Sequence, residues 1–96
     1  MKQTVELNAV LTRNPNQLFS NIDDEVVMLS VQNGEYYNLN EIGSHICNLL
    51  ETPLSLESIV NKLCNDYDVN KQDCIVETRD FIQRLIEKNV VLVVNE

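Results

Sequence analysis

The chain has 96 residues, of which 44% are hydrophobic and 23% charged, and this length and composition are typical of one globular domain with a single core. A formal net charge of −8 weighs against nucleic-acid binding, because affinity for phosphates comes largely from Lys and Arg. The sequence has neither a signal-peptide core nor an apolar run of the ~20 residues that span a bilayer, so we expect a cytoplasmic protein without membrane contact.

The first 17 residues have extended character without a clear strand. Asn8 interrupts the apolar pattern, and the segment Asn14-Pro15-Asn16 is a strong chain-breaking signal. We therefore interpret residues 1–17 as a loosely docked N-terminal arm and residues 18–94 as the single folded domain.

A small antiparallel sheet is predicted after this arm. Leu18 to Ile22 and Glu25 to Gln32 are rich in apolar and β-branched residues and are separated by a turn. Asn33-Gly34 favours a tight hairpin, because both residues tolerate positive φ at low cost. The chain should then return as a third strand, Glu35 to Leu39, at the edge of a three-stranded meander.

Apolar residues then recur with helical spacing in three segments, each preceded by a side chain that can cap a helix N-terminus. The segments are residues 41–50, 56–67 and 71–88, and the caps are Asn40, Ser55 and Asn70. The continuous apolar run Val90 to Val94 predicts a short C-terminal strand. The predicted fold class is α+β and winged-helix-like: a three-stranded antiparallel sheet, then a three-helix bundle, then a short strand.

The last predicted helix has two apolar stripes side by side. The first stripe contains Cys74, Thr78, Phe81 and Leu85, and the second contains Ile75, Ile82 and Ile86. Because a helix needs only one apolar stripe to reach the core, the other can face a groove.

Residues able to carry chemistry are few. Three cysteines without a C-x-x-C pair indicate reduced thiols, and Cys64 and Cys74 lie on apolar stripes typical of a core. His45 is the only imidazole, so it cannot form a zinc site with a second histidine, and a thiol nucleophile would have no other imidazole as its base. We therefore expect no metal, no cofactor and no enzymatic activity.

Two functions remain open on the residues alone. A winged-helix regulator would place the third helix in DNA, but this helix carries four basic and four acidic residues and has no net positive charge. A peptide binder would instead use the free edge of Glu35 to Leu39, to which an extended peptide can add as a strand. Alternate side chains of the peptide would then enter a groove beside the third helix.

Several segments resemble the PqqD family over about residues 18 to 94. They are Gly34 to Gly43 (GEYYNLNEIG), Ile46, Leu49-Leu50, the helix opening Ser55 to Val60, Tyr67, and the closing segment Leu85 to Val91. This family supplies the recognition element for ribosomally made, post-translationally modified peptides (RiPPs): a small winged-helix-like module that binds the precursor's leader. The tyrosine pair is most similar to the stand-alone leader-binding proteins of lasso-peptide biosynthesis.

The sequence departs from the family pattern at two places. Asn89 and the segment Glu51-Thr52 stand where family members often have a glycine. Asn also tolerates left-handed φ, so we expect Asn89 to end the third helix.

The resemblance implies a binding site, in which the leader pairs antiparallel to the third strand and packs on the third helix. The implied peptide-binding residues are Glu35, Tyr36, Tyr37, Asn38, Leu39, Ile75, Arg79, Ile82 and Ile86. It further implies a non-catalytic, monomeric peptide chaperone. Its partners would be the leader of a precursor peptide and a modifying enzyme: a lasso-type leader protease acting with a cyclase, or a radical SAM enzyme.

Overall fold

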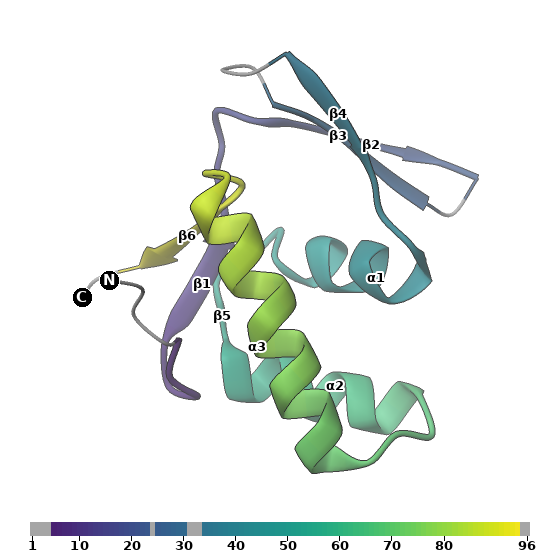
Figure 1. The fold of residues 1–96 in the computed structure, drawn as a ribbon, viewed down its shortest axis with the longest axis vertical. Coiled ribbons are helices and arrows are strands. Elements are labelled where there is room, and N and C mark those ends of the chain that lie inside the picture. Colours follow the sequence, from purple (N-terminus) through teal and green to yellow (C-terminus); the bar gives the residue numbers. More distant parts are fainter. Residues whose placement is uncertain (1–4, 24, 31–33, 95–96) are drawn as a thin grey trace.

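The computed structural model describes residues 5–23, 25–30 and 34–94, which form six strands and three helices (Figure 1). The strands are β1 (Val10–Arg13), β2 (Leu18–Ile22), β3 (Glu25–Ser30), β4 (Glu35–Asn38), β5 (Leu54–Ser55) and β6 (Val91–Val94), and the helices are α1 (Glu41–Leu49), α2 (Leu56–Asp66) and α3 (Lys71–Glu87). The three predicted caps are confirmed, since Asn40, Ser55 and Asn70 each accept a hydrogen bond from a backbone N–H in the first turn. Asn89 has φ 62°, as expected for a residue that ends α3.

Strands β2, β3 and β4 form the predicted antiparallel sheet in that order. The predicted turn includes Asn33, which lies outside the described residues. The register of β3 and β4 differs from the register that a two-residue turn at Asn33-Gly34 would give. Ser30 pairs with Glu35, whereas a two-residue turn at Asn33-Gly34 would pair Gln32 with Glu35. The shift is two residues, so every side chain of β4 keeps the face that the alternation predicts.

A second sheet, which the sequence analysis did not anticipate, includes the N-terminal segment. Strand β1 lies between β5 and β6 and is antiparallel to both (Figure 1). Leu11 is fully buried, and Val5 and Gln17 are also buried. The interpretation of a loosely docked arm is therefore wrong from Val5 onward, because the Pro15 turn ends β1 without detaching it from the core.

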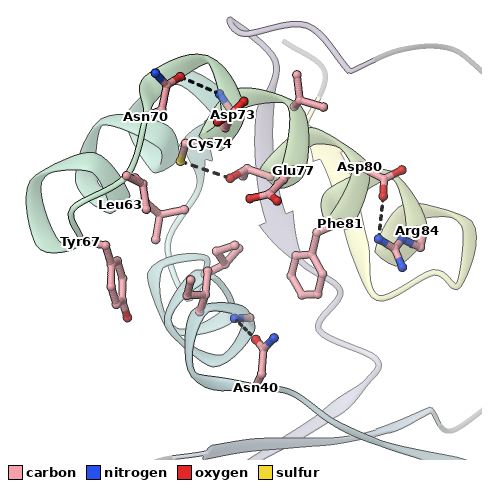
Figure 2. Close-up of a pocket in the computed structure, with 16 residues that line it drawn as sticks. Asn40, Leu63, Tyr67, Asn70, Asp73, Cys74, Glu77, Asp80, Phe81 and Arg84 are labelled. Carbon is pink, nitrogen blue, oxygen red and sulfur yellow. Dashed lines mark hydrogen bonds and ion pairs between the residues drawn. The ribbon is translucent and has the colours of Figure 1, made fainter.

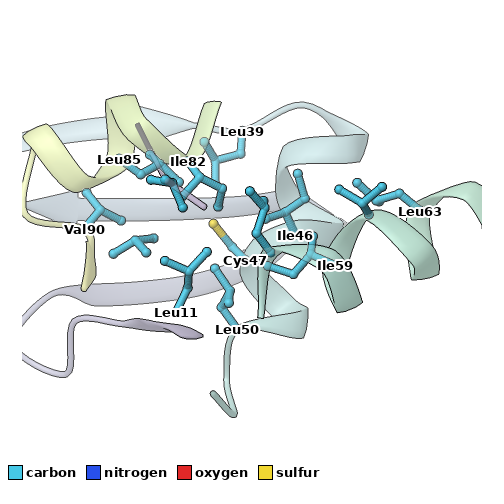
Figure 3. Packing of buried hydrophobic residues seen from close by; sticks show 14 of the residues in the cluster. Leu11, Leu39, Ile46, Cys47, Leu50, Ile59, Leu63, Ile82, Leu85 and Val90 are labelled. Atoms are coloured by element: carbon cyan, nitrogen blue, oxygen red, sulfur yellow. The ribbon is translucent and has the colours of Figure 1, made fainter. Parts of the chain in front are cut away.

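One hydrophobic cluster joins both sheets and all three helices (Figure 3). Leu11 from β1, Ile46 from α1 and Ile82 from α3 are each at most 2% exposed. Burying each such aliphatic side chain contributes about 1.5–3 kcal/mol. The helices therefore share their core with two sheets instead of forming a separate bundle after one sheet. Within the described part of the chain, no helix is long and apolar enough to cross a membrane.

Ser44 of α1 holds the end of the β3–β4 ladder. Its hydroxyl accepts a hydrogen bond from the Val26 N–H at 2.8 Å and donates one to the Leu39 carbonyl at 3.1 Å. The Leu39 N–H in turn donates to the Val26 carbonyl at 3.1 Å. The serine hydroxyl thus replaces one of the two backbone hydrogen bonds between these residues and fixes α1 to the sheet.

Replacing this hydroxyl should destabilise the protein. We expect Ser44→Ala to lower the free energy of unfolding by about 1–3 kcal/mol, because a buried N–H and a buried carbonyl lose their partner. Urea denaturation measures the change. Ser20→Ala on β2, where the side chain is exposed, is the control and should change stability by less than about 0.5 kcal/mol. Equal losses in the two variants would contradict the bridging role of Ser44.

Candidate peptide-binding site

The free edge of β4 presents backbone groups of Tyr36 and Asn38. The hydrogen bond from Leu39 to Val26 identifies a hydrogen-bonded pair, and such pairs recur every second residue, so Tyr37 also faces β3. The N–H and C=O groups of Tyr36 and Asn38 therefore point away from β3, to a side where no described strand lies. These groups are available to a further strand.

The side chains of β4 alternate between the two faces of the sheet, as predicted. Leu39 is buried, and Tyr37 is half-buried against the core. The Tyr37 hydroxyl donates to the Glu35 carboxylate at 2.8 Å, and the Lys88 ammonium lies 5.1 Å from the Tyr37 ring centroid. Tyr36 is on the opposite face and is 73% exposed. The two tyrosines thus have different environments on either side of the same backbone edge.

A close contact between α1 and α3 lies where β4 ends. Asn40 accepts a hydrogen bond from the Gly43 N–H at 2.8 Å and so starts α1 two residues after the end of β4. A Cβ atom at Gly43 would lie 3.1 Å from Cζ of Phe81, which is tighter than most contacts of that kind. The absent side chain therefore allows Phe81 of α3 to pack close to the first turn of α1.

A groove of about 810 Å³ extends from this contact along α3 (Figure 2). Its walls come from Asn40 and the first turns of α1, the end of α2 and the segment after it, and one side of α3. Apolar side chains in these walls include Ile42 and Val76, which are 42% and 62% exposed, and half-buried Phe81. Because only Leu39 separates Asn40 from β4, the groove begins near the end of the free strand edge.

The groove is acidic. Its lining includes three carboxylates and one guanidinium, contributed by Asp73, Glu77, Asp80 and Arg84 of α3. Arg84 already pairs with Asp80 at 2.6 Å, which leaves the charge of the other two carboxylates uncompensated by this guanidinium (Figure 2). A ligand with a basic side chain at this position would be electrostatically favoured.

The structure corrects the expected groove stripe of α3. Ile82 is fully buried in the core, and the Arg79 guanidinium donates from Nε to the Val5 carbonyl at 2.8 Å. Ile75 and Ile86 are half-buried against the core cluster. This stripe therefore faces the core and the N-terminal segment. The charged side chains that line the groove, Asp73, Glu77, Asp80 and Arg84, each lie two positions before a residue of this stripe, which is about 200° around the helix axis.

The sequence pattern therefore assigned only some residues of the two apolar stripes to the correct side of α3. Cys74, Thr78 and Leu85 are buried, as expected for the core stripe. Phe81, assigned to the same stripe, instead lines the groove, and Ile82 takes its place in the core. The acidic side chains next to Phe81 were the signal for a solvent-facing wall, because uncompensated carboxylates are rarely buried.

Two thiols near these elements, those of Cys47 and Cys74, have a raised pKa, which is opposite to what a nucleophile needs. Burial raises the pKa of Cys47 to about 11, although nearby Arg13 acts in the opposite direction. Burial also raises the pKa of Cys74, whose Sγ lies 3.7 Å from the Thr78 hydroxyl. Reactive thiols need a lowered pKa. Among the residues that the structure describes, no three His, Cys, Asp or Glu side chains form a group that could hold a metal ion.

Comparisons with known proteins agree with this architecture. A model of the PqqD family, described as coenzyme PQQ synthesis protein D, matches residues 25–91. The solved structure of TbiB1 in complex with the TbiA(beta) leader peptide is similar, with 33% identity and a TM-score of 0.80 over 88% of this chain and 99% of that chain. The structure of a lasso peptide synthetase B1 complexed with the leader peptide has the same fold, with 23% identity and a TM-score of 0.75 over 85% of this chain and 96% of that chain. No curated protein is similar enough to count as a match. Because the family model spans well over half of the sequence, the chain belongs to the PqqD family.

Proposed function

We propose that this chain binds the leader region of a ribosomally made precursor peptide by adding it as a fourth strand beside β4. The observation that carries the proposal is the outward row of backbone groups at Tyr36 and Asn38, which leads past Asn40 into the acidic groove. The two solved structures named above, of TbiB1 and of a lasso peptide synthetase B1, are complexes with leader peptides.

The two parts of the site have different roles in this proposal. Backbone hydrogen bonds at the β4 edge hold any extended peptide, whereas the groove selects among peptides by their side chains. An apolar side chain of the leader would lie against Ile42 and Phe81, and a basic side chain would approach Glu77. Such a site supports a dissociation constant of about 1 μM or tighter, which corresponds to roughly −8 kcal/mol.

The chain itself takes no part in the chemistry of modification in this proposal. It raises the local concentration of the precursor at the enzymes that act on it. The recipients are a lasso-type leader protease and the cyclase that closes the ring. The 33% identity to TbiB1, whose solved structure is a complex with a leader peptide, supports the leader-binding part of this proposal.

Titration of a fluorescently labelled leader peptide tests the proposal. We expect saturable binding, and we expect Ile42→Ser to weaken it about tenfold, since an Ile contact contributes about 1.5 kcal/mol or more. Leu92→Ser on β6 is the matched control, because Leu92 is 38% exposed and Ile42 is 42% exposed. Absence of saturable binding, or an equal effect of the two substitutions, would count against the proposed site.

A further inference from the structure

We infer that the outer face of the β2-β3-β4 sheet is a docking surface for the enzyme that receives the leader, and that this enzyme presents an apolar patch with a basic rim. The outer face is the one opposite α1, and its apolar residues are Leu18, Ile22, Val27, Leu29 and Tyr36. The identity of the partner as the recipient enzyme rests on the proposed function. The existence of the surface rests on the sheet alone.

The register of the sheet brings these side chains together. Leu18 pairs with Leu29, and Leu29 pairs with Tyr36, so that three apolar residues form one row across the sheet. Directly opposed residues of antiparallel strands project from the same face. Val27 lies two residues from Leu29 along β3 and therefore adjoins this row, and Ile22 extends the patch toward the other end of β2.

The outer face is uncovered in the described part of the structure. Helix α1 packs on the opposite face, against β3, where Met28 is fully buried (Figure 1). On the outer face, Leu18, Ile22 and Tyr36 are 57%, 55% and 73% exposed. Contiguous exposed apolar side chains of this kind mark interaction sites on soluble proteins.

Charge selects the class of partner. The sequence has no Lys or Arg between residues 14 and 61, whereas Asp23 in the turn after β2 and Glu25, which pairs with Ile22 on the outer face, are exposed. Two cations that touch the sheet, Arg13 and Lys88, lie over the rings of Phe19 and Tyr37 on the inner face.

An acidic rim disfavours two other occupants. A second copy of this chain would place acidic rims against each other without cations between them. An anionic lipid surface would be repelled in the same way. A protein patch with Lys or Arg around an apolar centre is complementary in both respects.

The outer face is also continuous with the proposed peptide site. A leader strand added to β4 would extend the sheet, and every second side chain of the leader would project beside Tyr36 on this face. One enzyme surface can therefore contact the sheet and the peptide together.

Paired double variants test the docking surface. The outer variant is Leu18→Ser with Ile22→Ser, and the matched control is Leu92→Ser with Val93→Ser, which removes two exposed apolar side chains from the edge strand β6 of the other sheet. The probes are the purified leader protease and cyclase encoded with the precursor, and association is measured by calorimetry with and without leader. We expect the outer variant to bind the enzyme at least tenfold more weakly than the control. Leader affinity should not change, because β3 separates β2 from the β4 edge.

Each result of this experiment is decisive. Charge reversal by Glu25→Lys should also weaken enzyme binding, as a basic rim on the partner requires. Equal enzyme affinity of the two double variants, or no association of the wild type with either enzyme, would overturn the inference. The wild type could instead self-associate in sedimentation or bind anionic vesicles. If only the outer variant lost that property, the face would belong to another occupant, and the inference would be overturned as well. If the wild type did not bind the leader, the proposed function would be overturned. The docking surface would still be tested by the association of the enzyme measured without leader.

Discussion

Asn38→Pro is expected to weaken leader binding at least tenfold, or about 1.4 kcal/mol, while the protein stays folded. The Asn38 N–H points to the free edge of β4, so its removal breaks no hydrogen bond of the sheet. A bound peptide would lose that donor, and the proline ring would obstruct its approach. Proline is tolerated on edge strands where the N–H faces outward, which is why this position separates binding from folding.

The matched control is Asn38→Ala, which changes the same exposed side chain and keeps the N–H. Leader affinity is measured by fluorescence anisotropy, and folding by circular dichroism and thermal unfolding. Leu39→Pro would be uninformative, because the Leu39 N–H bonds to Val26 inside the ladder and its side chain is buried. If Asn38→Pro is folded and binds the leader as tightly as Asn38→Ala, strand addition at β4 is refuted.

Ile82→Ala should lower the free energy of unfolding by about 2–5 kcal/mol, which is a large fraction of the stability of a small domain. Ile82 of α3 is fully buried in the hydrophobic core cluster, so truncation leaves a cavity (Figure 3). Urea denaturation measures this loss. At a temperature where the variant is folded, leader affinity should be unchanged, because Ile82 does not line the groove.

Val76→Ala is the control for this prediction. Val76 also lies on α3 but is 62% exposed in the groove wall, so its truncation should change stability by less than about 0.5 kcal/mol. It should weaken leader binding instead. The opposite pattern, with Ile82 affecting only affinity and Val76 only stability, would show that α3 turns its other side to the peptide.

The local features of this fold were predictable from short segments. Helix caps such as Asn40 and Asn70 bond to backbone groups three residues away, so a short stretch of sequence is enough to predict them. The faces of Tyr36 and Tyr37 follow from strand alternation, which is insensitive to the register shift of two residues. The backbone edge at β4, the main element of the proposed site, was therefore predicted correctly as an edge.

The partners of distant segments were not predictable in this way. Strand β1 (Val10–Arg13) pairs with β5 and β6, which lie more than 40 residues later in the chain, and no local pattern specifies that pairing. The alternation of Val5, Leu7 and Leu11 was a strand signal, but without a known partner it was compatible with an arm. The hydrogen bonds of Ser44 to β3 and to Leu39 are likewise tertiary.

The orientation of α3 depended on this same segment. Its sequence determined a helix with apolar residues over a wide arc, starting at the Asn70 cap and ending before Asn89. Only the tertiary structure decided which part of that arc is buried, because the N-terminal segment covers the side that carries Arg79. The sequence by itself thus determined the three helices, the β2-β3-β4 sheet and the free β4 edge, which depend on local hydrogen bonds and alternation. The tertiary structure placed Phe81 and the α3 carboxylates in the groove, because burial depends on which distant segments pack against each side of the helix.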